Sequence, residues 1–290
     1  MFFQGDGMSV EWTALGSGSK GNCSYLEYGS TRLLIDAGLS GKQIRERLAA
    51  IGKSAERLNG ILLTHEHSDH IQGLAVMGRQ LGIPVFCNRL TADSLPLKIR
   101  EHLKLKIFST GSHFTVGEID IEPASIPHDA ADPVSFLIHA GGFQMGILTD
   151  LGHVTRLIRE RFKKANALLL ETNYDLELLR KDVKRPWSIK QRIQSRHGHL
   201  SNEDAANFLE EIMHADLADV TLGHLSQDCN DPETARSCIQ SRLELIGAGH
   251  VKLQVATQDR PCATIRKRLE SSEPQGSLPL FFDDPQPANG

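Results

Sequence analysis

The residues best suited to chemistry in this chain lie in one short segment, Thr64-His-Glu-His-Ser-Asp-His70. Four side chains that commonly bind metal ions, His65, His67, Asp69 and His70, fall within six positions there. Imidazole and carboxylate groups together suit zinc, manganese or iron. The alternative is a polar surface turn that happens to be rich in histidine, but packing requires no such density of ligands. The segment therefore predicts a metal-dependent enzyme.

A strand must position this segment, because the apolar run 60–63 precedes it directly. Three more side chains that bind metals follow apolar runs in the same way, namely His128, Asp150 and His224. Loops at strand ends are where rigid scaffolds present functional groups. We therefore expect these three side chains to converge on the segment 64–70.

The remaining pattern alternates strands and helices in two halves. Helices are predicted at 41–51, 69–81, 154–162, 201–213 and 232–245. Strands are predicted at 10–15, 24–28, 32–36, 60–64, near 85, and at 106–108, 119–124, 135–140, 143–149, 167–171, 219–222 and 251–256, the last closing the domain. Strand runs flanked by helices predict an α/β (α+β) fold, with two mixed sheets packed face to face and helices outside.

The motifs in their order resemble those of the metallo-β-lactamase superfamily: Asp36, His65-x-His67-x-Asp69-His70, His128, Asp150 and His224. The segments Gly16-Ser-Gly-Ser-Lys-Gly-Asn22 and Gly198-His-Leu-Ser-Asn202 are similar to those of its YycJ/WalJ-like group. The resemblance covers about residues 8–269 and implies a four-layer αββα sandwich. It also implies a single-domain 5′ to 3′ exonuclease, because an inserted domain of about 150 residues does not fit before His224.

The resemblance also implies roles for individual residues. Two divalent ions, zinc or manganese with iron also compatible, would be held by His65, His67 and His128 on one side, by Asp69, His70 and His224 on the other, and by Asp150 between them. Such ions generate hydroxide near neutral pH and stabilise the attacking and leaving oxygens of a phosphodiester. Asp36 is expected to orient either a ligand imidazole or the loop that carries the ligands. Asp36, Asp69 and His199 form the expected catalytic group of a DNA exonuclease serving replication or repair.

A second group of residues is expected near the substrate. The segment 198–201 opens the predicted helix 201–213, where exposed amides favour anions. His199 resembles the histidine of the Gly-His-Ser-Thr segment in tRNase Z and is expected to donate a proton to the leaving oxygen; an ordinary loop residue is the alternative. Glu171 is expected to orient its neighbours at most, since Leu170 replaces the histidine that precedes the equivalent glutamate in tRNase Z. The predicted substrate-binding residues are Ser201, Asn202, Glu171 and Arg196.

Seven basic residues lie between Arg180 and Arg196, where Asp182 is the only acid. Such a run either contacts the phosphates of a nucleic acid or forms a solvated charged face. The pattern does not choose between these alternatives.

Composition sets the remaining bounds on the 290-residue chain. Its formal charge of −4 gives no global basic signature, and its five cysteines include no Cys-x-x-Cys pair. No segment is apolar and long enough to span a membrane, so a cytoplasmic protein is expected. Residues 1–7 are expected to be an expression scar, 8–270 the catalytic domain and 271–290 a disordered tail.

The tail contains an apolar segment from Gln275 to Phe282. It resembles the bacterial sliding-clamp motif, although Gly276 stands where leucine is usual; packing against its own domain is the alternative.

Three rival functions of the whole protein also stay open. They are a hydrolase of small cyclic phosphodiesters, lactams or thioesters, an RNA-directed nuclease, and a non-catalytic scaffold that binds a partner through its tail. An iron oxygen-reductase is disfavoured, because that class carries glutamate at the position of His67.

Overall fold

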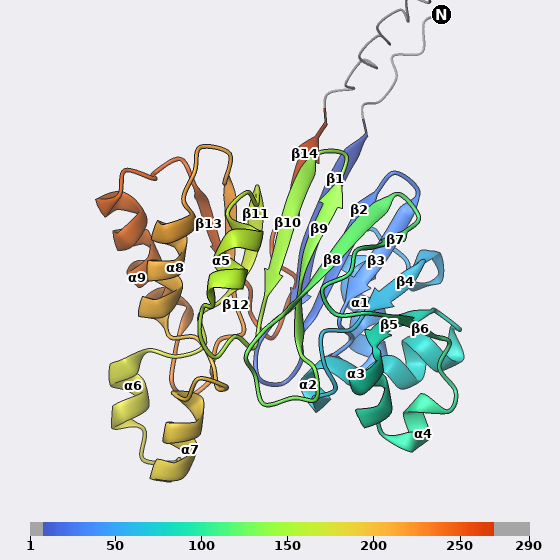
Figure 1. Ribbon diagram of the computed structural model, residues 1–290, viewed down its shortest axis with the longest axis horizontal. Helices are drawn as coiled ribbons and strands as arrows, with labels where there is room; N and C mark the ends of the chain where they lie inside the picture. The colour runs from blue at the N-terminus through green and yellow to red at the C-terminus, as the bar shows by residue number, and fades with distance from the viewer. Residues whose placement is uncertain (1–7, 270–290) are drawn as a thin grey trace, which may run out of the picture.

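The computed structural model describes residues 8–269, which form two β-sheets packed face to face with helices on the outer side of each (Figure 1). Each sheet has seven strands and contains both parallel and antiparallel pairs. The predicted αββα sandwich of two mixed sheets is therefore confirmed. The expectations for residues 1–7 and for the clamp-like segment 275–282 concern parts of the chain outside the described residues.

The first sheet contains β1 (Ser9–Gly16), β2 (Cys23–Tyr28), β3 (Thr31–Ile35), β4 (Gly60–Leu62), β5 (Val85–Asn88), β6 (Leu105–Phe108) and β14 (Ile265–Arg268). Their order across the sheet is β14-β1-β2-β3-β4-β5-β6. The strands β14, β1, β2 and β3 are antiparallel, whereas β3 to β6 are parallel. Parallel strands end at the same edge of a sheet, so the loops that follow β3 and β4 lie side by side.

The second sheet contains β7 (Phe114–Val116), β8 (Ile119–Ser125), β9 (Val134–Ala140), β10 (Phe143–Leu148), β11 (Ala167–Glu171), β12 (Asp219–Gly223) and β13 (Lys252–Val255). Their order is β13-β12-β11-β10-β9-β8-β7, with β10 to β13 parallel. The parallel strand β11 is entirely buried and reads as an uninterrupted apolar run, Ala-Leu-Leu-Leu, before Glu171. The loops after β10, β11 and β12 consequently lie together at one edge.

Helices cover both outer faces. The first sheet carries α1 (Gly41–Ala50), the 3₁₀ turn η1 (Ala55–Arg57), α2 (Ser68–Ile71), the π-helical turn η2 (Ala75–Gln80), α3 (Arg89–Ser94) and α4 (Leu97–Arg100). The second carries α5 (Arg156–Phe162), α6 (Leu176–Lys181), α7 (Trp187–Ile193), α8 (Asn202–Ile212) and α9 (Pro232–Leu245). Figure 1 shows α6 and α7 projecting at lower left, beyond the end of the second sheet.

The helix α8 illustrates how the sequence attaches a helix to its sheet. Ser201 caps its start by accepting the N–H of Asp204 at 3.0 Å. Ala205, Phe208 and Ile212 then follow at helical spacing, and all are buried in the cluster that packs against β11 and β12. This anchoring fixes the loop that precedes α8, which carries His199.

Two predicted elements are wrong in detail. The helix expected at 69–81 is broken into α2 and η2, because the N–H of Gly73 donates to the carbonyl of Ala37 at 2.6 Å. A Cβ atom at position 73 would lie 2.5 Å from the carbonyl oxygen of Leu39, so the chain there is pressed against the loop after β3.

The strand predicted at 251–256 is not the last strand of the domain. β14 follows it and pairs with β1; its sequence, Ile-Arg-Lys-Arg, lacks the alternation that would reveal a strand. The short elements β7, α3, α4, α6 and α7 were not predicted.

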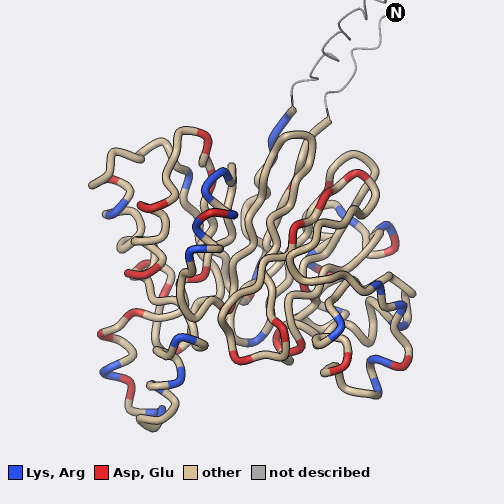
Figure 2. The backbone as a smooth tube through the Cα atoms, viewed as in Figure 1, with Lys and Arg blue, Asp and Glu red and all other residues tan. Residues whose placement is uncertain are grey.

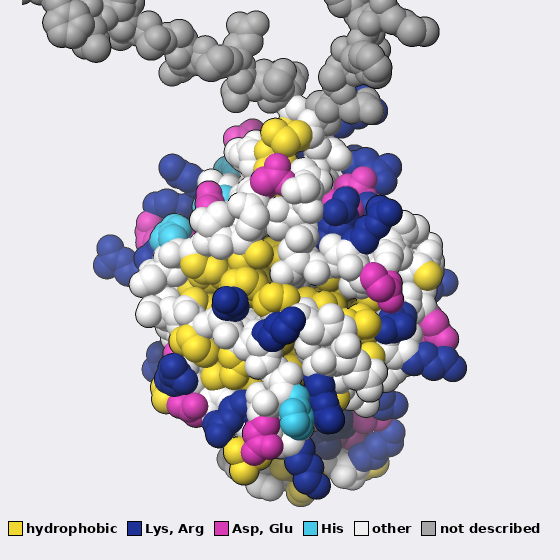
Figure 3. Space-filling view, turned by 90° about the vertical axis from the view of Figure 1, so that its right-hand side faces the viewer, with side chains coloured by type: hydrophobic (Ala, Val, Ile, Leu, Met, Phe, Trp, Pro, Cys, Tyr) yellow, Lys and Arg dark blue, Asp and Glu magenta, His cyan; other side chains and the backbone are white. Residues whose placement is uncertain are grey.

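One side of the sandwich exposes the free edges of β6 and β7. Figure 3 faces this side and shows a band of hydrophobic side chains with lysine or arginine side chains among them. Ile107 of β6 is 42% exposed, and Lys106 beside it is exposed as well. Lysine on a free strand edge opposes pairing with another chain, which suits a protein that must not aggregate through this edge.

Candidate metal centre

All seven predicted metal ligands meet at one end of the sandwich, in loops that follow strands. The histidine-rich segment follows β4, while His128, Asp150 and His224 follow β8, β10 and β12. Among residues 8–269, the non-glycine residues with positive φ are Asp36 (58°), Asp150 (56°) and His224 (55°). A left-handed backbone at such residues costs about 1 kcal/mol or more. The three residues with strained backbone therefore direct their side chains to the same end of the sandwich.

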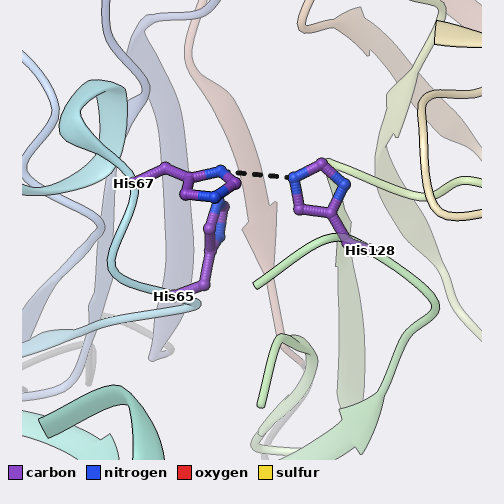
Figure 4. Close-up of side chains that lie close together, drawn as sticks. All are labelled: His65, His67 and His128. Carbon is purple, nitrogen blue, oxygen red and sulfur yellow. Dashed lines mark hydrogen bonds between the residues drawn. The ribbon is translucent and has the colours of Figure 1, made fainter. Parts of the chain in front are cut away.

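His65, His67 and His128 form the first cluster (Figure 4). Nδ1 of His67 lies 3.4 Å from Nε2 of His128, and Nε2 of His65 is buried without a hydrogen-bond partner. Nδ1 of His128 donates to the carbonyl of Gly198 at 3.0 Å, which leaves a lone pair on its Nε2. Burial, assisted by the charge of His70, holds the pKa of His65 well below its usual value. Neutral imidazoles with inward lone pairs are what a three-histidine metal site requires.

Asp69, His70 and His224 form the second cluster. Oδ2 of Asp69 lies 3.5 Å from Nε2 of His70 and 3.4 Å from Nε2 of His224. Asp150 touches both clusters. Its Oδ2 is 3.0 Å from Nε2 of His70, and its Oδ1 is 3.6 Å from Nε2 of His128 and 3.5 Å from Nε2 of His224.

The electrostatics of these residues fit a site for cations. Burial alone would raise the pKa of Asp150, but His224 and His70 outweigh it and hold that pKa well below its usual value. Burial alone would lower the pKa of His70 and of His224, but the carboxylates, Asp150 prominent among them, hold both well above their usual values. The buried carboxylates therefore demand positive charge, which protons or divalent metal ions can supply. The mixture of imidazole and carboxylate ligands suits metal ions.

Carboxylates behind the clusters fix the orientation of the rings. Oδ2 of Asp36 accepts the Nδ1–H of His70 at 2.8 Å, and Oε1 of Glu171 accepts the Nδ1–H of His224 at 2.8 Å. The hydroxyl of Thr64 donates to Asp36 at 2.9 Å. Each bond leaves Nε2 of the ring facing the cluster. The contact made by Asp36 is the one expected from the sequence, while its part in catalysis stays a prediction.

Glu171 also lies within ligand distance of Asp150, His199 and His224. Its Oε1 already accepts N–H groups from both histidines, and its Oε2 accepts the N–H of Leu151 at 2.6 Å. Because both oxygens are occupied by donors, we assign Glu171 to orienting the histidines rather than to binding an ion.

The other predicted site residues differ in what they contact. His199 donates from Nδ1 to Glu171 at 2.8 Å, and its ring centroid is 5.3 Å from that of His128. Burial lowers the pKa of His199, but Glu171 outweighs burial and raises that pKa above its usual value.

Ser201 caps α8, and the buried amide of Asn202 is bonded to Asn230. Arg196 is exposed at the rim; its binding of substrate, and that of Ser201, Asn202 and Glu171, stays a prediction.

Asn22 is a site residue that the sequence analysis did not identify. Its Nδ2 lies 3.2 Å from Nε2 of His70 and 3.4 Å from Oδ2 of Asp69. Nearby, the hydroxyl of Ser17 accepts the N–H of His224 at 2.8 Å. Both belong to the glycine-rich turn after β1, whose polar residues were the available signal. Only the fold brings that turn against a loop more than 200 residues later.

The charge of the basic run 180–196 is largely neutralised within the protein. Figure 2 shows acidic and basic positions side by side along α6, whereas α7 carries only basic ones. Five of the seven residues are held by carboxylates or carbonyls: Arg180 by Glu177, Lys184 by Asp228, Arg185 by Asp182 and Asp228, Arg192 by Asp129, and Lys190 by the carbonyls of Arg180 and Asp182. Lys181 and Arg196 make no ion pair within residues 8–269. A solvated face thus describes most of the run.

Comparison with known proteins decides the family. Residues 31–220 match the model of the beta-lactamase superfamily domain. The chain is also 38% identical over 249 residues to the exodeoxyribonuclease YycJ of Bacillus anthracis, a match that covers 83% of this chain and 92% of that protein. The chain belongs to the metallo-β-lactamase superfamily. Within it, the exodeoxyribonuclease WalJ of Streptococcus pneumoniae is 38% identical as well, over 81% of this chain and 89% of WalJ.

Solved structures of low sequence identity share the fold. The Bacillus subtilis protein YhfI superposes with a TM-score of 0.69 at 16% identity, over 89% of this chain and all of YhfI. Human tRNase Z, short form, superposes with a TM-score of 0.60 at 17% identity, over 87% of this chain and 98% of tRNase Z. No helix among residues 8–269 has the length and apolar character that crossing a membrane requires.

Proposed function

We propose that this protein is an exodeoxyribonuclease that degrades DNA from the 5′ end with the help of two divalent ions, zinc or manganese. The observation that carries the proposal is the convergence of five histidines and two aspartates, from four separate strand ends, into overlapping clusters suited to metals. The names of the relatives that match along most of their length, YycJ and WalJ, support DNA as the substrate.

In this proposal His65, His67 and His128 would hold one ion, Asp69, His70 and His224 would hold the other, and Asp150 would contribute to both. The ions would supply a nucleophilic hydroxide near neutral pH and charge stabilisation for a phosphodiester. Asp36 and Glu171 keep His70 and His224 in the tautomer whose Nε2 faces the ions. The buried position of these acceptors prevents the rings from turning.

His199 is proposed to donate the proton that the leaving oxygen needs. Its Nδ1–H is held by Glu171, so the opposite nitrogen, Nε2, is free for a proton at the cleft. The ring is 24% exposed, enough to reach a substrate, and it neighbours both His128 and His224. A cytoplasmic location follows for an enzyme that acts on chromosomal DNA.

A hydrolysis assay with four substrates tests the proposal. End-labelled single-stranded DNA, double-stranded DNA, RNA and a small chromogenic phosphodiester would each be incubated with manganese, zinc or chelator. Progressive shortening of DNA from the 5′ end, lost in chelator, is the expected result. Turnover of the small ester alone would reject a nuclease in favour of a small-molecule hydrolase, and preference for RNA would reject DNA as the substrate.

Two variants and one control variant separate chemistry from folding in that assay. Asp69→Ala should abolish cleavage and lower the amount of bound metal, whereas Asp216→Ala, at an exposed position away from the clusters, should change neither. His199→Ala should lower kcat by about 10²- to 10⁴-fold with metal content unchanged. Full activity of His199→Ala would remove His199 from the mechanism while leaving the metal centre in place.

We further propose that the segment 275–282, outside the described residues, binds the bacterial sliding clamp. Its Gln-x-x-Leu-Pro-Leu spacing is the support. Deleting residues 271–290 should abolish binding to a purified clamp in surface plasmon resonance and leave cleavage of short DNA unchanged. Equal affinity of the full and shortened chains would contradict this assignment.

A further inference from the structure

A polar cavity lies beside the loops that carry the metal clusters. Its volume is about 370 Å³, and it is bounded by the loop after β10, the end of α7 and the exposed side of α8. Polar and charged residues dominate its wall: His153, Arg159, Gln194, Ser195, Arg196, Asp204, Asn207 and Glu211, of which Arg159 and Glu211 form an ion pair with each other. None of these residues belongs to the two metal clusters.

Arg196 is the distinctive group in this cavity. It makes no ion pair within the described chain, unlike most of the basic run around it. His153 holds it from two sides: Nδ1 of His153 donates to the carbonyl of Arg196 at 3.0 Å, and Nη2 of Arg196 donates to Nε2 of His153 at 3.2 Å. One neutral tautomer of His153 satisfies both bonds, because one nitrogen donates and the other accepts. The protein therefore orients a guanidinium that makes no ion pair with a carboxylate among residues 8–269.

The cavity shares its walls with the loops that carry the catalytic residues. Gly152 is two positions after Asp150, and a Cβ atom there would lie 2.3 Å from the carbonyl oxygen of Arg196 and 2.9 Å from the backbone nitrogen of Gly198. Gly198 in turn accepts from His128. The two loops thus pack directly on one another, with the metal ligands on one side and the cavity on the other.

The composition of the wall matches a nucleotide. A guanidinium binds phosphate through paired N–H groups. Asp204 Oδ2 accepts the hydroxyl of Ser201 and Asn207 Oδ1 accepts from Arg242, which leaves Oδ1 of Asp204 and the amide N–H₂ of Asn207 for the edge of a base. The buried side chains of Leu200 and Phe208 form apolar parts of the wall. The volume lies within the range of sites that hold small ligands.

We infer that this cavity binds the nucleotide adjacent to the scissile phosphate, with Arg196 bound to its phosphate group and His153 positioning Arg196. The inference rests on the proposed nuclease function and adds a binding site for a nucleoside 5′-monophosphate unit. That unit is either the end of the DNA chain or the released product.

The experiment compares two basic residues that make no ion pair within residues 8–269. Arg196→Gln removes the charge in the cavity, and Lys181→Gln, on α6, removes a charge of the same sign outside it. For a 5′-phosphorylated oligonucleotide, Arg196→Gln should raise KM about tenfold or more, as expected for loss of a charged hydrogen bond, with kcat at saturation little changed. Lys181→Gln should leave both values unchanged. His153→Phe should raise KM by a smaller factor without lowering thermal stability.

Binding of deoxyadenosine 5′-monophosphate to the metal-loaded protein tests the cavity independently of cleavage. Nuclear magnetic resonance shifts should appear at Gly152 and Asn207 and should vanish in Arg196→Gln. If the wild-type protein cleaves no DNA, the proposed function fails while this binding still decides the cavity. An unchanged KM for Arg196→Gln, an equal effect of Lys181→Gln, or shifts confined to the metal-binding histidines would each overturn the inference. Binding of the oligonucleotide but not of the monophosphate would assign the site to the DNA end rather than to the product.

Discussion

Oε1 of Glu171 lies 2.8 Å from Nδ1 of His199, and the same oxygen lies 2.8 Å from Nδ1 of His224. The other oxygen, Oε2, accepts backbone N–H groups from Leu151 at 2.6 Å and Leu200 at 3.4 Å. Four donors therefore converge on one fully buried side chain. Only an ionised carboxylate, which accepts on both oxygens, satisfies all four.

Replacing Glu171 with glutamine should damage the centre despite the matching shape. The new amide N–H₂ must face either the two histidines or the two backbone N–H groups, and either choice opposes donor to donor. We expect metal affinity to fall by about 10- to 100-fold, as for other residues that orient metal-binding histidines. Isothermal titration with manganese measures this. Glu122→Gln, at a buried glutamate of β8 far from the centre, is the control and should bind metal normally.

Asp36 combines an orienting role with a strained backbone, and two substitutions separate them. Asp36→Asn keeps a residue that tolerates positive φ, so the fold should persist while metal affinity falls about 10- to 100-fold. Asp36→Ala should in addition lower the free energy of unfolding by about 1 kcal/mol relative to Asp36→Asn, because alanine fits poorly at a φ of 58°. Urea unfolding of both variants without metal checks the difference. Equal stabilities would show that the backbone at this position is not strained.

Gly38 allows the loop that carries Asp69 to approach the loop after β3 closely, because glycine has no side chain. A Cβ atom at this position would lie 1.6 Å from the carbonyl oxygen of Asp69, which accepts the N–H of Asn22 at 2.8 Å. Gly38→Ala should therefore displace Asp69, cost about 1–3 kcal/mol of stability and reduce metal content. Gly249→Ala, where a Cβ would meet nothing within 4 Å, is the matched control and should be neutral. Normal metal binding by Gly38→Ala would disprove the close approach.

Acid stability should depend on an ion cluster distant from the site. Lys53 pairs with Glu11 at 2.8 Å and also with Glu27. Burial alone would raise the pKa of both carboxyl groups, but Lys53, together with neighbouring donors, outweighs burial and holds each pKa below its usual value. A carboxyl group with a depressed pKa contributes stability that is complete above its unfolded pKa and is lost as the pH falls through its folded pKa.

Lys53→Met should accordingly lower the free energy of unfolding at pH 7, and the deficit should shrink as the pH is lowered from about 5 to 3. Chemical unfolding monitored across this range measures the deficit. Lys42→Met, which breaks only an exposed pair with Glu46, should show little effect at any pH. A deficit that stays constant down to pH 3 would contradict the role of the carboxylates.

The sequence by itself identified the candidate metal-binding side chains and the αββα fold, for reasons that can be named. Buried strands read as apolar runs, and polar residues that end such runs mark the loops of a sheet edge, so His128, Asp150 and His224 could be expected beside His65. The spacing of the histidine-rich segment needed no tertiary information, because its four ligands are neighbours in the chain.

The tertiary structure decided which groups act together across long separations. The neutralisation of Arg185 depends on Asp228, and the double contact of Glu171 depends on His199 and His224, none of which is close in sequence. The break at Gly73 and the pairing of β14 with β1 likewise arise from contacts with remote backbone. Local patterns report propensity and periodicity, whereas ion pairs, steric limits and cavities exist only once distant segments are brought into contact.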